Sequence, residues 1–300
     1  MSSPRTVIVF GPTGQIGSVA ALTAHGEGAK VILAMRDPSK PIPILDGLSA
    51  GRVQADLTKP ETVSTAVRQT GAKHAFIYIA HGGNDGMRGS ITALKDAGIE
   101  SVVFLSSFTI EKDIRDVSPT ELIPYIHAQV EISLDEIFAG NSVSVRPGYF
   151  ASNSLQMKSD CLAGEVKLPN PDALFDWIAP ADIGRVCGKI LAHGSEERVV
   201  PLVGPHKLTY HKVVAGIGRV LGKDIKITKV EGEEAVDVMC AKLHVPRHFA
   251  EWFVANITGD SSDISHSPDY TKAVENIWKY NKEPVTFEQW LKENKALFVD

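Results

Sequence analysis

A glycine-rich segment close to the N-terminus constrains the fold of this chain more than any other feature of its sequence. It reads Gly11-Pro12-Thr13-Gly14-Gln15-Ile16-Gly17 and directly follows the apolar, β-branched run Thr6–Phe10. In a strand–loop–helix unit, the first two glycines let the chain turn and approach a pyrophosphate, and the third lets helix and strand pack closely. The free amides of a helix N-terminus also favour an anion. The segment therefore predicts a dinucleotide site rather than a merely structural turn, with Gly11, Thr13, Gly14, Gln15, Ile16 and Gly17 as its contacts.

The first half of the chain alternates buried-strand patterns with amphipathic helical patterns. The strand candidates are Thr6–Phe10, Lys30–Met35, Arg52–Gln54, His74–Ala80, Ser101–Ser106 and Ser142–Val145. The helical candidates between them are Gln15–Ala24, Pro60–Gln69, Arg88–Asp96 and Glu121–Phe138. This alternation is typical of βαβ units, whose crossover helices cover both faces of a parallel sheet. We therefore predict an α/β fold with a doubly wound, Rossmann-type parallel sheet.

The chain has 300 residues, and single cores stop growing near about 250 residues, so a second lobe is expected. We expect a dinucleotide-binding Rossmann domain over residues 1–155, onto which some later segments pack back, and a smaller α+β substrate lobe over residues 156–300. The strand-like runs of that lobe are Val166–Leu168, Phe175–Ile178, Val199–Val203 and Ile225–Lys229, and its helical runs include Ala181–Leu191 and Tyr210–Leu221. All four tryptophans, Trp177, Trp252, Trp278 and Trp290, fall there and predict either a wall of a ligand cleft or a packed core.

Composition and charge exclude several classes of protein. A net charge of -5 leaves no basic surplus for nucleic acid or an anionic membrane. The three cysteines form no CxxC pair and leave an odd thiol, so a disulfide framework is not expected. The apolar run before Gly11 is too short for a signal peptide, and we expect a cytoplasmic protein. His244, His248 and Glu251 lack a second cluster to complete a ligand set, so no metal site is expected.

The end of the second predicted strand indicates which dinucleotide is bound. Arg36 at the strand tip and Lys40 in the following loop can pair with a 2′-phosphate. Asp37 stands one residue too late for the position from which an acidic side chain binds the ribose of NAD. The sequence therefore favours NADP(H), and the alternative is that Arg36 and Lys40 are solvated loop charges.

Residues at the ends of the next two strands are further cofactor candidates. Asp56 and Leu57 follow the third strand, where a side chain can reach the adenine amino group, although Asp56 can equally cap a turn. Ala80, His81 and Gly82 end the fourth strand, where mostly small residues let a cofactor cross the sheet edge at the switch point. His81 either contacts cofactor or substrate or only adds polarity to the loop.

Five segments together resemble the NmrA-like family, a branch of the atypical short-chain dehydrogenase/reductase superfamily. They are the glycine motif, the run from Arg36 to Lys40, Ser106-Ser107 after the fifth strand, Arg146-Pro147-Gly148-Tyr149-Phe150-Ala151-Ser152-Asn153 after the sixth, and Thr286-Phe287-Glu288-Gln289-Trp290-Leu291 near the end. The resemblance implies an NADP(H)-binding Rossmann domain, a smaller C-terminal substrate domain and an active site in the cleft between them. Some members of the family resemble reductases of enones, imines, quinones or phenylpropanoids. Others resemble redox sensors that bind cofactor without turnover and regulate a protein partner.

The resemblance also identifies candidate catalytic residues on the helix that follows the fifth strand. In the wider superfamily a tyrosine there donates a proton, and a lysine four residues later lowers its pKa. Here Tyr125 takes the place of the tyrosine, but Gln129 replaces the lysine. A neutral amide can bind the nicotinamide ribose, but it cannot stabilise a phenolate. The alternative is that Tyr125 is a packing residue at the helix start.

Three routes would compensate for the missing lysine. Hydride transfer to an activated quinone or iminium needs little general acid. His127 or His81 can carry a proton, since histidine titrates near neutrality. Ser106, Ser107 and Tyr125 can polarise a carbonyl as hydrogen-bond donors.

Residues after the fifth and sixth strands complete the predicted site. We expect Ser106, Pro147, Gly148 and Tyr149 at the cofactor, and Ser107, Phe108, Tyr149, Phe150 and Asn153 at the substrate. The preferred hypothesis is an NADP(H)-dependent oxidoreductase of a small conjugated or aromatic carbonyl, quinone or imine. One alternative is a non-catalytic NADP(H) sensor that acts through a protein partner, and another is a non-redox isomerase.

Overall fold

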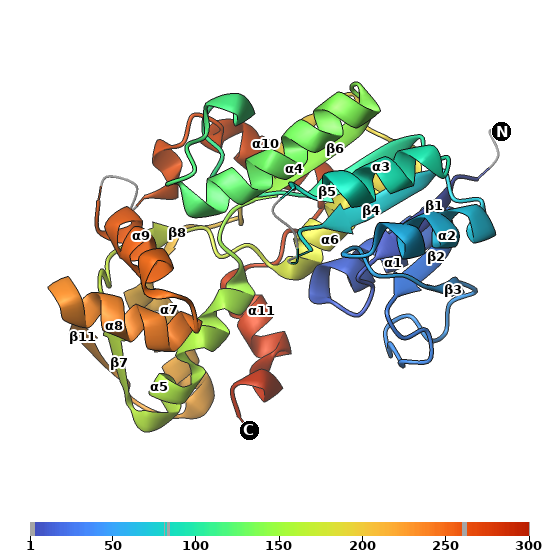
Figure 1. Ribbon diagram of the computed structural model, residues 1–300. Coiled ribbons are helices and arrows are strands. Elements are labelled where there is room, and N and C mark those ends of the chain that lie inside the picture. Colours follow the sequence, from blue (N-terminus) through green and yellow to red (C-terminus); the bar gives the residue numbers. More distant parts are fainter. Residues whose placement is uncertain (1–3, 81, 83–84, 260–262, 300) are drawn as a thin grey trace. The chain divides into compact units, whose positions relative to one another are not determined.

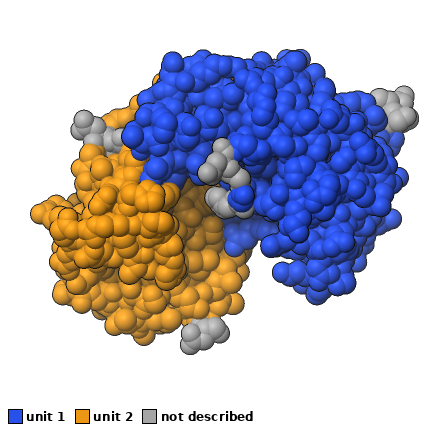
Figure 2. All heavy atoms as spheres, viewed as in Figure 1, with its two compact units in different colours: residues 1–147, 180–202, 278–282 blue, residues 148–179, 203–277, 283–300 orange. Residues whose placement is uncertain are grey.

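A computed structural model describes residues 4–80, 82, 85–259 and 263–299 of the chain (Figure 1). The chain divides into two compact units (Figure 2). Unit 1 comprises Met1–Pro147, Pro180–Leu202 and Trp278–Lys282, and unit 2 comprises Gly148–Ala179, Val203–Ile277 and Glu283–Asp300. The chain thus leaves unit 1 after Pro147 rather than at residue 155, and two later segments return to it.

A seven-stranded parallel sheet forms the centre of unit 1, with the strand order β3-β2-β1-β4-β5-β6-β9. The strands are β1 (Thr6–Phe10), β2 (Lys30–Met35), β3 (Gly51–Gln54), β4 (His74–Tyr78), β5 (Ser101–Leu105), β6 (Ser142–Pro147) and β9 (Val199–Leu202). Val7 of β1 pairs with both Val31 of β2 and His74 of β4, so the order of connection reverses at β1. This is the doubly wound Rossmann topology that the sequence predicts. The strand-like run Val199–Val203, which follows residue 155, supplies the edge strand β9 of this sheet.

Helices cover both faces of this sheet (Figure 1). They are α1 (Gln15–Gly26), α2 (Pro60–Thr70), α3 (Arg88–Asp96), α4 (Leu122–Phe138) and α6 (Pro180–His193), and the short 3-10 helix η1 (Ile114–Asp116) packs against α4. Because side chains alternate along a strand, Ile8 and Phe10 face one side, where they share a core with α2, α3 and α4. The other face is covered by α1 and α6.

Helices α6 and α1 pack closely because two residues of α6 at the contact have no side chain. A Cβ atom on Gly184 would lie 2.6 Å from the Val19 Cβ. One on Gly188 would lie 2.6 Å from the Ala20 carbonyl oxygen. Only glycine permits this approach, so the second half of the sequence supplies a helix that is tightly fitted to the first.

Unit 2 combines two small sheets with helices and is an α+β lobe. Strand β7 (Glu165–Leu168) pairs in parallel with β11 (Lys226–Lys229), and β8 (Leu174–Phe175) pairs antiparallel with β10 (Leu208–Thr209). The helices are η2 (Ala151–Met157), α5 (Lys158–Ala163), α7 (Tyr210–Leu221), α8 (Gly232–Leu243), α9 (Arg247–Thr258), η4 (Ile264–His266), α10 (Tyr270–Tyr280, whose last turn belongs to unit 1), α11 (Phe287–Glu293) and η5 (Lys295–Leu297). The strand expected over Phe175–Ile178 is shorter, because Trp177 has a φ of 45° and interrupts the extended backbone.

Two of the four tryptophans form the aromatic core of unit 2. Trp177 is buried, with its ring centroid 5.5 Å from that of Phe287, and Phe287 in turn stacks on the buried Trp290 at 5.8 Å. Trp252 belongs to a separate cluster between α8 and α9. Trp278 lies in a later segment that returns to unit 1, and it is 53% exposed.

The described part of the chain holds neither a membrane-spanning helix nor a disulfide. None of its helices is both long and apolar enough to cross a bilayer. Cys161, Cys187 and Cys240 are free thiols. Burial raises the pKa of Cys161 to about 11, which keeps this thiol protonated and unreactive.

Candidate functional site

The glycine loop between β1 and α1 forms a turn that requires two of its three glycines. Gly11 has a φ of 68°, a left-handed conformation that favours glycine. Its carbonyl oxygen accepts a hydrogen bond from the Gly14 amide at 3.1 Å, which closes the turn. A Cβ on Gly17 would lie 2.3 Å from that same oxygen. Gly11 and Gly17 are therefore required for reasons internal to the chain.

Gly14 differs from these two glycines because the chain itself does not require a glycine there. Its φ of -86° and ψ of 160° suit any residue, and a Cβ would meet no atom closer than the Gly11 oxygen at 3.5 Å. Thr13, Gly14 and Gln15 are exposed, whereas the Ile16 side chain is buried. Within the described residues, no side chain caps the first amides of α1. The loop therefore presents an open helix N-terminus whose backbone a phosphate can approach.

The tip of β2 presents exposed positive charge. The side chains of Arg36 and Lys40 are exposed, and neither forms an ion pair within the described ranges. The Asp37 carboxylate instead accepts hydrogen bonds from the Ser39 amide at 2.9 Å and the Ser39 hydroxyl at 2.6 Å, which hold the pKa of Asp37 below its usual value. Arg52, which the sequence did not single out, donates to the Lys40 carbonyl oxygen at 2.7 Å and fixes the loop.

The candidates after β3 and β4 follow strands that end at the same edge of the sheet as β1 and β2, because all four are parallel. The Asp56 carboxylate accepts hydrogen bonds from the Thr58 amide at 2.9 Å and the Thr58 hydroxyl at 2.8 Å, and these bonds lower its pKa. Asp56 therefore caps the turn that follows β3, which is one of the two roles that its position in the sequence allows. Leu57 is buried, Ala80 is half-buried, Gly82 is exposed, and His81 lies outside the described residues.

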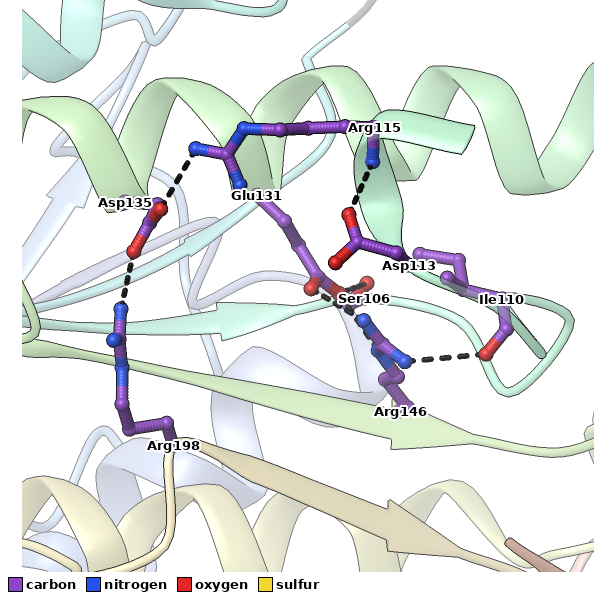
Figure 3. Close-up of polar contacts among 8 residues, drawn as sticks. All are labelled: Ser106, Ile110, Asp113, Arg115, Glu131, Asp135, Arg146 and Arg198. Carbon is purple, nitrogen blue, oxygen red and sulfur yellow. Dashed lines mark hydrogen bonds and ion pairs between the residues drawn. The ribbon is translucent and has the colours of Figure 1, made fainter. Parts of the chain in front are cut away.

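A buried ion pair joins the ends of β5 and β6 to the middle of α4 (Figure 3). Glu131 accepts hydrogen bonds from Arg146 Nε at 2.9 Å and Nη2 at 2.7 Å. The Ser106 hydroxyl donates to Glu131 Oε1 at 2.5 Å, and Arg146 Nη1 donates to the Ile110 carbonyl oxygen at 3.1 Å. Ser106, Glu131 and Arg146 are 4%, 5% and 7% exposed. The proton of Ser106 is therefore directed at a buried carboxylate.

A second ion-pair cluster lies on the same helix, one turn beyond Glu131 (Figure 3). Asp135 accepts hydrogen bonds from Arg115 at 2.9 Å and from Arg198 at 2.5 Å. Both arginines are about half exposed, and exposed pairs typically contribute no more than about 1 kcal/mol. This exposed cluster connects η1 and the start of β9 to α4. The buried pair instead connects the ends of β5 and β6 to α4 in the interior.

The three candidates on α4 have different surroundings. Tyr125 packs against the buried cluster of Ile110, Val117 and Ala128, and its hydroxyl forms no hydrogen bond within the described residues. His127 Nδ1 lies 2.8 Å from the Ile123 carbonyl oxygen, one turn back along the helix. The Gln129 backbone lies against Gly86, where a Cβ would be 2.6 Å from the Gln129 carbonyl oxygen.

The two residues after Ser106 contribute to the fold of their loop. The Phe108 amide donates to the Pro147 carbonyl oxygen at 3.0 Å, and the Phe108 side chain is 4% exposed, so it belongs to the core rather than to an open wall. Ser107 is half-buried, and its hydroxyl lies 2.9 Å from that of Thr109.

The remaining candidates, Gly148, Tyr149, Phe150 and Asn153, belong to unit 2. The Tyr149 ring packs on Phe175 at 4.4 Å between centroids, and its hydroxyl lies 3.3 Å from that of Tyr210. Burial raises the pKa of Tyr149 to about 12. Tyr149 is thus a member of the aromatic core of unit 2. The Phe150 backbone pairs with Ile178 and its side chain is half-buried, as is that of Asn153.

A buried carboxylate in unit 2 was not predicted. Asp176 is 1% exposed and accepts hydrogen bonds from the amides of Tyr149 and Gly204, each at 2.7 Å. A Cβ on Gly148 would lie 2.4 Å from Asp176 Oδ1, so Gly148 is a glycine because the carboxylate occupies that space. Burial raises the pKa of Asp176 to about 6.

One sequence signal could have revealed the buried pair in unit 1. Arg146 stands in a strand whose other residues are nearly all apolar or small, and a charge inside a sheet that is covered on both faces requires a partner. Glu131 stands between apolar positions of α4 and is the matching acid. Among the described residues, no group of three His, Cys, Asp or Glu could hold a metal ion.

The family model and one curated relative identify the family of this chain, and two solved structures share its fold. The model of the NmrA-like family matches residues 3–291. A "Nitrogen metabolite regulation-like protein bik4" of Gibberella fujikuroi is 35% identical over an alignment of 330 residues that covers all of both chains. A Citrobacter triphenylmethane reductase solved with NADP(H) has a TM-score of 0.74 at 16% identity and covers 96% of this chain and 99% of its own. NmrA, a negative transcriptional regulator, has a TM-score of 0.69 at 17% identity, with 98% and 96% covered. The chain therefore belongs to the NmrA-like family.

Proposed function

We propose that this protein binds NADP(H) and acts as a redox-responsive regulator of a protein partner, without the acid–base machinery of a short-chain reductase. The proposal that it binds NADP(H) rests on the loop around Gly14 and on Arg36. Gly14 leaves room at an uncapped helix N-terminus, which suits a pyrophosphate. Arg36 has no ion-pair partner in the described chain, and its planar guanidinium suits a 2′-phosphate.

The observation that supports a regulatory rather than a catalytic function is the hydrogen bond from Ser106 to Glu131. A serine that polarises a carbonyl must direct its proton at the substrate. Here the proton goes to a carboxylate that also pairs with Arg146, and all three side chains are buried. Freeing Ser106 would leave the buried carboxylate with one hydrogen bond fewer, at a cost of about 1–3 kcal/mol.

Two further features support this proposal. Gln129 cannot supply the positive charge that lowers the pKa of a catalytic tyrosine. The relative that is 35% identical over its full length carries the name of a nitrogen metabolite regulation-like protein. The reductase solved with NADP(H) supports the cofactor through its fold.

One observation favours an oxidoreductase as a second candidate function. The Tyr125 hydroxyl has no hydrogen-bond partner in the described residues and is half-exposed, so it is free to donate to a substrate. NADPH when bound supplies a hydride, and an acceptor such as a quinone or iminium needs little additional acid. Under this alternative, Tyr125 would orient the acceptor rather than act as the main acid.

A turnover screen with a binding control separates the two functions. NADP+ and NADPH affinities are measured by calorimetry, and NADPH oxidation is then followed by absorbance with a panel of quinones, enones and imines. The regulatory proposal expects NADP(H) binding without oxidation above the uncatalysed rate. Turnover at the rates usual for enzymes, about 1–1000 per second, would overturn it in favour of the oxidoreductase. Loss of that turnover in Tyr125→Phe would assign the residue a role in it.

The same calorimetry tests the assignment of Arg36. Arg36→Ala should weaken NADP+ binding by about 10- to 100-fold and leave NAD+ binding nearly unchanged, because a hydrogen-bonded charge contributes about 1.5–3 kcal/mol. Lys30→Ala, at the opposite end of the same strand and also exposed, is the matched control. NAD+ binding at least as tight as NADP+ binding in the unaltered protein would contradict the preference for NADP(H).

A further inference from the structure

Tyr78 lies directly against the glycine loop and was not among the predicted site residues. It is the last residue of β4, next to β1 in the sheet. A Cβ on Gly11 would lie 2.5 Å from Tyr78 Cε1 and 3.1 Å from Tyr78 Cζ. The ring therefore covers the α-carbon of Gly11 and occupies the space that a side chain there would need. Gly11 thus has a second reason to be glycine, beyond its positive φ.

The Tyr78 hydroxyl is available to a ligand. The residue is 38% exposed, and its hydroxyl forms no hydrogen bond with any described residue. This sets it apart from Tyr149, whose hydroxyl is paired with that of Tyr210. Burial of the ring raises the pKa of Tyr78, so the phenol keeps its proton at neutral pH. A neutral phenol at this position is a hydrogen-bond donor.

Charged groups close to Tyr78 indicate what it would bind. Arg36 and Asp56 both lie close enough to act on the Tyr78 phenol electrostatically, from the ends of β2 and β3. Asp56 is committed to Thr58, whereas Arg36 is unpaired. The edge of the sheet next to Gly11 therefore combines an unused cation, an unused O–H donor and the free amides of α1. Donors without an acceptor of their own suit an anion with several oxygens, such as a phosphate.

We propose that the Tyr78 hydroxyl donates a hydrogen bond to a phosphate oxygen of the dinucleotide bound at the glycine loop. The inference rests on the proposed NADP(H) binding and adds a residue that controls its affinity. Two phosphate groups of the cofactor share this chemistry, the 2′-phosphate beside Arg36 and the pyrophosphate beside Gly14. Tyr78 is a binding residue here and takes no part in proton transfer.

Calorimetry with Tyr78→Phe tests the proposal. Phenylalanine keeps the ring against Gly11 and removes only the hydroxyl, so the fold is preserved. We expect NADP+ binding to weaken by about tenfold, the effect of losing a hydrogen bond to a charged group. Tyr280→Phe, a phenol on α10 in the same unit, is the matched control and should bind as the unaltered protein does.

Measurements with NAD+ identify the phosphate. An equal loss for NAD+ and NADP+ assigns the hydroxyl to the pyrophosphate, and a loss for NADP+ alone assigns it to the 2′-phosphate. Unchanged affinity for both cofactors in Tyr78→Phe would overturn the inference while leaving NADP(H) binding intact. Tighter binding in Tyr78→Ala would also overturn it, because the ring would then obstruct the site. Absence of NADP(H) binding in the unaltered protein would refute the proposed function itself.

Discussion

Gly14 and Gly17 stand three residues apart in one motif, yet the structure gives them different reasons to be glycine. A methyl group on Gly17 would collide with the Gly11 carbonyl oxygen at 2.3 Å, whereas a methyl group on Gly14 meets only a contact of 3.5 Å. The first constraint belongs to the fold. The protein by itself has room for a side chain at position 14. The absence of a side chain at Gly14 therefore matters only to a ligand that approaches the backbone.

This difference predicts opposite effects of the same substitution. Gly14→Ala should leave the free energy of unfolding within about 1 kcal/mol of the original and weaken NADP+ binding at least tenfold, because the methyl group blocks the pyrophosphate. Gly17→Ala should destabilise the protein by about 1–3 kcal/mol through overpacking. Urea denaturation and calorimetry measure the two effects separately. A Gly14→Ala variant with full affinity for NADP+ would contradict the assignment of the loop.

Ser106 and Tyr149 illustrate how far residue type alone indicates a role. The sequence places both after strands of the sheet, where ligands bind. Their hydroxyls are paired with Glu131 and Tyr210, which lie 25 and 61 positions further along the chain. The buried charge of Arg146 signals that an acid such as Glu131 lies nearby, but no local pattern shows that the hydroxyls of Ser106 and Tyr149 bond to these distant partners.

At the scale of elements, α1 and α6 pack closely against each other in unit 1. The sequence predicts a helix at Ala181–Leu191 and assigns it to the second half of the chain. The structure returns it to the sheet, where Gly184 and Gly188 allow it to approach α1. Two glycines spaced by one helical turn were the available signal, because glycine within a helix is unfavourable unless close packing requires it.

We therefore predict that Gly188→Ala destabilises the protein, although alanine is the better helix former. Its Cβ would lie 2.6 Å from the Ala20 carbonyl oxygen, so α1 and α6 must separate, at an expected cost of about 1–3 kcal/mol. Gly216→Ala in α7 is the matched control, since its Cβ would be no closer than 3.4 Å to any atom. The control should be neutral or stabilised by up to about 1 kcal/mol in urea denaturation. Equal stability of both variants would contradict this account of the packing.

At the scale of the whole molecule, the chain crosses from one unit to the other several times. Asp176 forms hydrogen bonds with residues close in sequence to three of these crossings. Its carboxylate accepts hydrogen bonds from Tyr149 and Gly204, and backbone hydrogen bonding from Ile178 also lowers its pKa. These residues follow or precede the changes of unit at Pro147, Ala179 and Leu202. Burial outweighs the hydrogen bonds and raises the pKa of Asp176 to about 6.

This raised pKa predicts a pH dependence of stability. The folded state binds the proton of Asp176 more tightly than the unfolded chain, whose aspartate has a pKa near about 3.9. The stabilisation due to this proton is therefore complete below about pH 4 and is lost as the pH rises through about 6. The loss amounts to about 3 kcal/mol relative to Asp176→Asn, which does not titrate.

Urea denaturation between pH 4 and pH 7, followed by tryptophan fluorescence, to which the buried Trp177 contributes, measures this difference. The exposed Asp172→Asn is the control and should parallel the unaltered protein across this range. A constant difference between the protein and its Asp176→Asn variant at all pH values would show that Asp176 does not titrate there.

The sequence by itself determined the Rossmann sheet, the glycine loop and the exposed charge at Arg36. These features follow from short-range rules: alternation of apolar residues, helix periodicity, and turns that need glycine. Only the tertiary structure decided that β9 and α6 return to the first unit, that Ser106 is bound to Glu131, and that the Tyr78 ring covers Gly11. Each of these depends on contacts between residues far apart in the chain. Such contacts are selected by packing and by the need to pair buried polar groups. A local pattern can mark one side of such a contact, as the spacing of Gly184 and Gly188 does, but it does not identify the partner.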